Sequence, residues 1–134
     1  MSAATGRFPW RALPALLYAA GIFYGGVIDI GPLPTVTFVA TDKLLHALAF
    51  AGLAVLAFFG LGTGSLRRRQ VLSVCLSTAA GGLLELIQTA LPYRSGDWLD
   101  LLADAIGAVV GAASLGWVSR SFAGRGQRVS TGAM

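Results

Sequence analysis

Polar side chains that can exchange protons or hold a cation occur at one end of each long apolar segment of this sequence. They comprise one imidazole, one amide, two bases and several carboxylates, and the candidates for a ligand-binding site are Asp42, Lys43, His46, Glu85, Gln88, Arg94, Asp100 and Asp104. Imidazole and carboxylate groups act as general acids or bases and also bind divalent metal ions. His46, Glu85 and Asp104 are therefore the candidates for catalytic residues.

The spacing of these residues places them on common helix faces. Asp42 and His46 are four positions apart, and Glu85 and Gln88 are three apart, so each pair lies on one side of its helix. Small residues continue the polar stripes inward, and the stripes are Gly21, Gly25 and Asp29, then Ser77, Gly81 and Glu85, then Asp104, Gly107, Gly111 and Ser114. Because small residues at this spacing let transmembrane helices approach closely, we expect the polar groups on packed faces around an acidic pocket.

The composition indicates that a lipid bilayer surrounds these helices. The chain has 134 residues, of which 55% are hydrophobic and 12% charged, and its mean hydropathy is +0.72. Soluble domains carry about 25% charged residues, and so small a chain cannot hide this much apolar side chain in a water-soluble core. A soluble enzyme and a disordered chain are therefore disfavoured, and the single cysteine, Cys75, excludes a disulfide framework and a multi-cysteine metal site.

Four segments have the length and character of membrane-spanning helices, which need about 20 mostly apolar residues. The first two segments reach that length between charges, whereas the last two reach it only if their polar residues are drawn into the helices. The first is longer than the apolar part of a signal peptide and has no clear cleavage site after it. We predict an all-α, four-helix transmembrane bundle formed by residues 11–119, with helices at about 11–30, 43–63, 70–91 and 98–119.

The distribution of charge predicts the orientation of these four spans. One side receives the tails 1–10 and 120–134 and the loop after the second helix, with eight arginines and no acidic residue: Arg7, Arg11, Arg67, Arg68, Arg69, Arg120, Arg125 and Arg128. The other side receives two basic and six acidic residues. By the positive-inside rule both termini are cytoplasmic and the acidic pocket faces outward. Arginines beside lipid are topology signals, so nucleic acid is not an expected partner. Residues 1–6 and 123–134 are rich in Gly, Ser, Ala and Thr and are expected to be disordered.

Depth in the bilayer singles out two of the carboxylates. Glu85 and Asp104 each lie sixteen residues from an arginine at the cytoplasmic boundary, Arg69 and Arg120 respectively. At 1.5 Å per residue this is about 24 Å, within a hydrocarbon layer of about 30 Å. A lone carboxylate at that depth is costly, so both groups need a partner. Arg94 is either an ordinary loop charge or the cation that neutralises one of them.

The order of the polar residues resembles that of the VanZ-like family of small bacterial membrane proteins, named for a member associated with resistance to the glycopeptide teicoplanin. The resemblance covers about residues 42–111 and is carried by Asp42-Lys43-x-x-His46, Glu85-x-x-Gln88, Arg94 and Asp100-x-x-x-Asp104-x-x-Gly107. Ala47 stands where the family usually has an aromatic residue, and Asp104 where it usually has asparagine. The resemblance implies a multi-pass protein of the bacterial cytoplasmic membrane whose ligand is a lipid-linked cell-wall precursor or a glycopeptide antibiotic.

Recognition of a polar or cationic group at the outer leaflet is the first function that these residues suggest. An acidic pocket matches the amino groups of peptide stems or glycopeptides. It repels a diphosphate headgroup unless Mg²⁺ bridges the two or Arg94 and Lys43 make the contact. Membrane lipid and a second copy of the chain are further expected partners, and no cofactor is required.

Catalysis and transport are the alternatives. An intramembrane enzyme acting on a lipid-linked substrate would use His46, Glu85 and Asp104 as acid–base groups or as ligands of a divalent metal ion. The absence of HExxH and GxSxG motifs and of a second histidine disfavours catalysis and leaves no metal ligand assigned. Small proton-coupled transporters usually place their key acid in the first helix, where residues 12–28 contain none. A membrane scaffold subunit is the remaining alternative.

Overall fold

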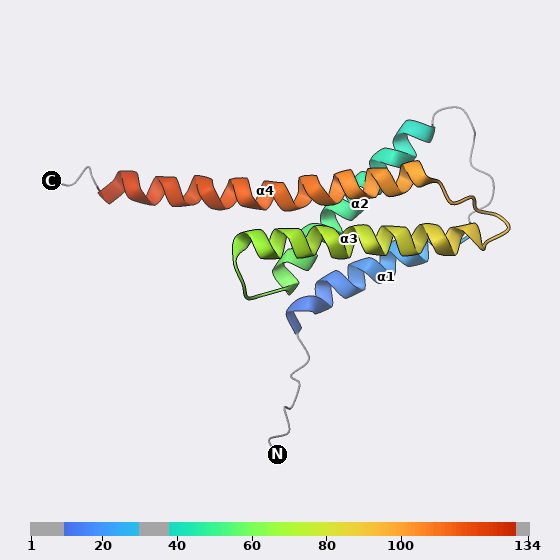
Figure 1. Ribbon diagram of the computed structural model, residues 1–134, viewed down its shortest axis with the longest axis horizontal. Helices are drawn as coiled ribbons and strands as arrows, with labels where there is room; N and C mark the ends of the chain where they lie inside the picture. Colours follow the sequence, from blue (N-terminus) through green and yellow to red (C-terminus); the bar gives the residue numbers. More distant parts are fainter. Residues whose placement is uncertain (1–9, 30–37, 131–134) are drawn as a thin grey trace, which may run out of the picture.

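Long apolar runs form the helices of this protein. The computed structural model describes residues 10–29 and 38–130, with side chains described for 10–29 and 41–118. Within these residues the chain forms a short 3₁₀ helix and four α-helices: η1 (Trp10–Ala12), α1 (Leu13–Val27), α2 (Phe38–Gly60), α3 (Leu66–Thr89) and α4 (Trp98–Ser130). Figure 1 shows α3 and α4 side by side, with α2 crossing behind both and α1 packed beside α3.

Three of the helices are long and apolar enough to cross a bilayer, over Thr41–Gly60 in α2, Leu66–Thr89 in α3 and Trp98–Val118 in α4. The prediction of an all-α protein is therefore confirmed for the described residues. α1 differs from the predicted 11–30 helix because it has only 15 residues, beginning after η1 and ending at Val27. At 1.5 Å per residue α1 is about 22 Å long, shorter than the usual span of about 20 residues.

The boundaries of the other helices also differ from those predicted. α2 begins at Phe38 instead of residue 43. α3 begins at Leu66 instead of residue 70, because the hydroxyl of Ser65 accepts a hydrogen bond from the backbone N–H of Arg68 at 3.3 Å and caps the helix. α4 passes the predicted end at residue 119 and continues to Ser130, since no proline interrupts it. The segment predicted as a disordered tail is thus helical up to that residue.

Two glycines permit the closest helix contact, which joins α2 to α4. A Cβ atom added at Gly107 would collide with the backbone of Ala47, and one added at Gly111 would lie 3.0 Å from the Cα of Ala51. Both glycines belong to the small-residue stripe predicted for the fourth helix, and this stripe packs within the chain. Because Asp104 continues the same stripe, the contact also carries its carboxylate into the bundle.

The stripe predicted for the third helix is buried as well. The hydroxyl of Ser77 donates a hydrogen bond to the carbonyl oxygen of Phe50 at 3.0 Å, which ties α3 to α2. A Cβ atom added at Gly81 would lie 2.5 Å from Oδ2 of Asp104, so α3 also packs directly on the carboxylate of α4. The apolar core beside these contacts consists of Phe50, Leu53 and Leu84.

The glycine stripe of α1 does not pack as predicted. A Cβ atom added at Gly21 or Gly25 would meet nothing within 4 Å, so these two residues border open space. Gly26 makes the helix contact instead, because its added Cβ would lie 2.7 Å from Cδ1 of Leu84. The expectation for this stripe is therefore wrong, since a neighbouring face of α1 turns toward the bundle.

Candidate functional site

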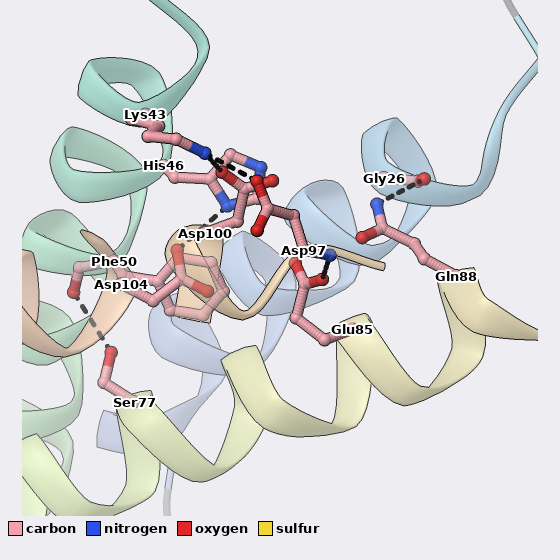
Figure 2. Close-up of polar contacts among 10 residues, drawn as sticks. All are labelled: Gly26, Lys43, His46, Phe50, Ser77, Glu85, Gln88, Asp97, Asp100 and Asp104. Atoms are coloured by element: carbon pink, nitrogen blue, oxygen red, sulfur yellow. Dashed lines mark hydrogen bonds and ion pairs between the residues drawn. The ribbon is translucent and has the colours of Figure 1, made fainter. Parts of the chain in front are cut away.

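Polar side chains from three helices and the α3–α4 loop meet at one end of the bundle (Figure 2). This end combines the first turns of α2 and α4 with the last turns of α3, because α3 runs opposite to the other two helices. We call these side chains the polar cluster, which consists of Lys43, His46, Glu85, Gln88, Asp97, Asp100 and Asp104. The cluster therefore contains most of the residues that the sequence singles out.

His46 and Asp104 form the centre of the polar cluster. Nδ1 of His46 and Oδ1 of Asp104 are 2.9 Å apart, and Asp104 is completely buried. The imidazole stacks on the ring of Phe50 with an interplanar angle of 11°. Stacking and hydrogen bonding together fix the orientation of the imidazole. The sequence places His46 on the same helix face as Asp42, whereas the structure pairs it with Asp104 across the α2–α4 contact.

The backbone of the α3–α4 loop holds Glu85. The N–H of Asp97 donates a hydrogen bond to Oε2 of Glu85 at 2.7 Å. Gly96 permits this close approach, because an added Cβ there would lie 2.5 Å from the methyl carbon of Thr89 and 3.0 Å from the carbonyl oxygen of Glu85. The Glu85 side chain is thus held in the bundle, where the residue is only 8% exposed.

Two carboxylate oxygens of the cluster are buried without a hydrogen-bond partner among the described residues. They are Oε1 of Glu85 and Oδ2 of Asp104. Buried polar atoms are nearly always hydrogen-bonded, and leaving one unsatisfied is costly. One donor atom from each of His46, Glu85 and Asp104 lies within 4.8 Å of the other two. This arrangement presents free acceptor atoms to one small volume and is suited to a cation or to the N–H groups of a ligand.

Lys43 neutralises the outer carboxylates of the cluster. Its Nζ lies 2.7 Å from Oδ1 of Asp100 and 2.9 Å from Oδ2 of Asp97. Oδ1 of Asp97 also accepts a hydrogen bond from the backbone N–H of Leu99 at 2.9 Å. The ammonium group and this N–H both hold the pKa of the Asp97 carboxyl below its usual range. Lys43 therefore neutralises Asp97 and Asp100, and its ion pairs do not include the two more deeply buried carboxylates, those of Glu85 and Asp104.

The end of α1 is held by side chains of α3 and the following loop. The last carbonyl groups of a helix have no partner within the helix. Here the donors are Gln88, Tyr93 and Arg94, and the acceptors are the carbonyl oxygens of Gly26, Val27 and Ile28, at 3.0, 2.9 and 3.3 Å respectively. Of the two roles considered for Arg94, neutralising a buried carboxylate is not the one observed, since its guanidinium binds the backbone of α1.

A groove of about 310 Å³ runs between α1 and the polar cluster. Its wall is polar at one end and apolar elsewhere, and it is lined by Asp42, His46, Gln88 and Arg94, by Gly21, Gly25 and Gly26, and by Ile22, Leu45, Ala49, Phe50 and Leu84. The open space beside Gly21 and Gly25 forms part of this groove. A larger cavity of about 480 Å³ lies among η1, α1, α2 and α3, but it contains no titratable side chain.

Comparison with families of known proteins agrees with this arrangement of polar residues. The family model described as VanZ/LLP1 matches residues 10–119. The chain belongs to the VanZ/LLP1 family. The match includes η1 and α1, which lie outside the 42–111 range of the resemblance described above. Comparisons with curated proteins and with solved structures found no match.

Some residues of this VanZ/LLP1 protein contribute to the site without having been predicted from the sequence. Asp97 binds Lys43 over a separation of 54 positions, and the hydroxyl of Tyr93 holds the backbone of α1. Both residues lie in the α3–α4 loop. The sequence signals for Asp97 are its spacing of three and seven positions from Asp100 and Asp104 and the Ser95-Gly96-Asp97 run typical of a helix cap, and its carboxylate does accept the backbone N–H of Leu99 in the first turn of α4. The only signal for Tyr93 was its closeness in sequence to Arg94. Asp42 is exposed at the groove and has a carboxylate oxygen within 4.8 Å of donor atoms of His46 and Asp100, so it lies at the edge of the polar cluster.

Proposed function

We propose that this VanZ/LLP1 protein recognises a polar or cationic group of an envelope ligand at the outer leaflet of the bacterial cytoplasmic membrane. The observation that carries the proposal is a groove lined by Asp42 and His46. The imidazole of His46 joins this groove to the buried carboxylate of Asp104, which, like Glu85, has an oxygen without a hydrogen-bond partner among the described residues. The ligand is a lipid-linked cell-wall precursor or a glycopeptide antibiotic.

The shape and lining of the groove support an amphipathic ligand. Ile22, Ala49 and Leu84 offer an apolar wall, and the absence of side chains at Gly21 and Gly25 leaves room beside it. Ligand sites commonly combine such an apolar lining with a few placed polar groups. An acyl chain would lie along the apolar wall, and the headgroup would lie at the polar end of the groove.

The charges at the polar end favour an amino group within that headgroup. Asp42 is exposed at the groove, and Lys43 already neutralises Asp97 and Asp100. Glu85 has a backbone N–H as its donor and no basic side chain within salt-bridge distance among the described residues. A ligand ammonium group in the groove would make a charge-assisted hydrogen bond with Asp42, the acid that lines it, and such bonds are stronger than neutral ones.

We propose in addition that four helices span the membrane and that both termini are cytoplasmic. Together with η1, α1 is about 28 Å long, close to the hydrocarbon thickness of about 30 Å, and a small mismatch is met by local thinning of the bilayer. Arginines gather near the α2–α3 turn, and the acidic residues gather at the opposite end of the bundle. This asymmetry supports an outward-facing polar cluster.

Cysteine labelling tests the proposed orientation. In a Cys75→Ser background, Ser95→Cys in the α3–α4 loop should react with a membrane-impermeant maleimide in intact cells, whereas Thr63→Cys in the α2–α3 turn should react only after permeabilisation. Both positions are exposed in the structure, so burial does not limit either reaction. Labelling of Thr63→Cys in intact cells would contradict the orientation.

Blocking the groove should weaken ligand binding. The variant Gly25→Leu places a side chain in the open space at Gly25. We expect the affinity for teicoplanin, an acylated glycopeptide, to fall about tenfold or more, because forcing two groups into the same space costs about 1–3 kcal/mol. The measurement is microscale thermophoresis of the protein in lipid nanodiscs.

The matched control is Ala20→Leu, which adds a similar side chain at an exposed position of α1 outside the groove. This variant should bind teicoplanin as the wild type does. Equal binding by Gly25→Leu and the wild type would remove the groove as the binding site, and no binding by the wild type would overturn the assignment of a glycopeptide ligand.

A further inference from the structure

We infer that His46, Glu85 and Asp104 together form a binding site for one divalent transition-metal ion. This inference deepens the proposed function and rests on it for the role of the ion, because His46, one of the three residues, also lines the groove to which the ligand is assigned.

The donor atoms lie close enough together for small side-chain movements to bring them to one ion. One donor atom of each residue lies within 4.8 Å of the other two, and the three side chains come from three different helices. Two ligand atoms at about 2.1 Å from an ion and at right angles to each other are about 3.0 Å apart. Nδ1 of His46 and Oδ1 of Asp104 are 2.9 Å apart, so the pair needs little movement to share an ion.

Burial and missing partners point to an occupant of this site. Asp104 is 0% exposed and Glu85 is 8% exposed, and each has one buried oxygen without a hydrogen-bond partner. Lys43, the lysine of the cluster, is already paired with Asp97 and Asp100. Among the described basic side chains, His46 alone lies within salt-bridge distance of either buried carboxylate, that of Asp104. A divalent ion supplies compensating charge and the missing contacts.

A second set of donors is less suitable for the ion. Asp42, His46 and Asp100 also have donor atoms within 4.8 Å of one another. However, Oδ1 of Asp100 accepts the ammonium group of Lys43 at 2.7 Å, and Asp42 is exposed to solvent. An ion bound by Asp42, His46 and Asp100 would compete with the ammonium group of Lys43. Glu85 and Asp104, in contrast, each have a carboxylate oxygen without a hydrogen-bond partner among the described residues.

The type of donor indicates the type of ion. Imidazole favours zinc, iron and related metals, and carboxylates favour manganese and magnesium, so one imidazole with two carboxylates suits Zn²⁺ or Mn²⁺. Three protein ligands leave coordination positions open. An ion in this site would offset the negative charge of the pocket and would present those positions to a carboxylate or phosphate oxygen of the ligand.

Binding of Mn²⁺ alone tests the site. Chelator-treated, full-length protein in mild detergent should bind one Mn²⁺ per chain, measured by electron paramagnetic resonance of the free ion. Glu85→Gln and Asp104→Asn should each weaken binding by at least about tenfold. Asp29→Asn removes an exposed acid that belongs neither to the polar cluster nor to the groove, so it should bind Mn²⁺ as the wild type does.

A spectroscopic measurement on the wild type keeps the inference testable if the variants fail to fold. Electron spin echo envelope modulation of the bound Mn²⁺ should show coupling to the ¹⁴N of an imidazole, and the chain has a single histidine. Mn²⁺ binding without this coupling would overturn the site. So would equal weakening in Asp29→Asn and Glu85→Gln, which would indicate diffuse attraction to acidic residues.

The outcome separates this inference from the proposed function. Protein that binds teicoplanin but not Mn²⁺ would overturn the metal site and leave the ligand pocket. If the expected variants weaken Mn²⁺ binding but Gly25→Leu binds teicoplanin as tightly as the wild type, the metal site is supported. The assignment of the ligand to the groove is then wrong.

Discussion

Replacing Gly107 by alanine is expected to cause a large loss of stability, although it adds a single methyl group and improves helix propensity. The added Cβ would collide with backbone atoms of Ala47, which cannot move aside as a flexible side chain does. Overpacking of this kind costs about 1–3 kcal/mol, and a backbone collision should lie at or above the upper end of that range. The midpoint of thermal unfolding in detergent, followed by tryptophan fluorescence, should therefore fall markedly.

Gly21→Ala is the control for this experiment. It makes the same chemical change in another helix, where the new Cβ would meet nothing within 4 Å. Glycine in a helix is less favourable than alanine by about 1 kcal/mol, so this variant should be as stable as the wild type or more so. If both variants unfold at the temperature of the wild type, the α2–α4 contact is not as close as described.

Replacing Gly81 by alanine is expected to disrupt the metal site while leaving the helices in place. The added Cβ would lie 2.5 Å from Oδ2 of Asp104, so the carboxylate must shift from the position in which its Oδ1 contacts His46. Loss of residues that orient metal ligands typically reduces affinity by about 10–100-fold. We expect a reduction of this size in Mn²⁺ affinity, with the helical circular dichroism of the wild type retained.

Gly82→Ala provides a matched comparison at the next position of α3. Its added Cβ would make an ordinary contact of 3.8 Å with Leu101, far from the ligand atoms. This variant should bind Mn²⁺ as the wild type does. Equal affinities of both glycine variants and the wild type would mean that α3 does not position Asp104.

Helical periodicity made part of the bundle predictable from the sequence. The stripes ending in Glu85 and Asp104 were predicted to be buried, because residues three or four apart share a helix face and because polar faces turn away from lipid. The structure buries both residues. The same reasoning failed for Gly21 and Gly25, since spacing identifies a small-residue face but not the helix that packs against it.

The pairing of the polar residues was not predictable in the same way. Lys43 binds Asp97 and Asp100, and His46 binds Asp104, over separations of more than fifty positions. Such pairs depend on the rotation of one helix relative to another, which side-chain packing determines. The length of α1 was missed for a similar reason, because the carbonyl groups at its end are satisfied by side chains from elsewhere in the chain.

The attachment of α1 has a consequence for how this protein can change its selectivity. Gln88, Tyr93 and Arg94 hold carbonyl oxygens, which every amino acid possesses, so these three bonds place no requirement on the side chains of Gly26, Val27 or Ile28. Substitutions on the groove-facing side of α1 can therefore change the shape of the groove to which we assign the ligand, without removing the bonds that hold the end of the helix. Glu85 and Asp104 belong to α3 and α4, so they would stay the same while substitutions in α1 change the groove.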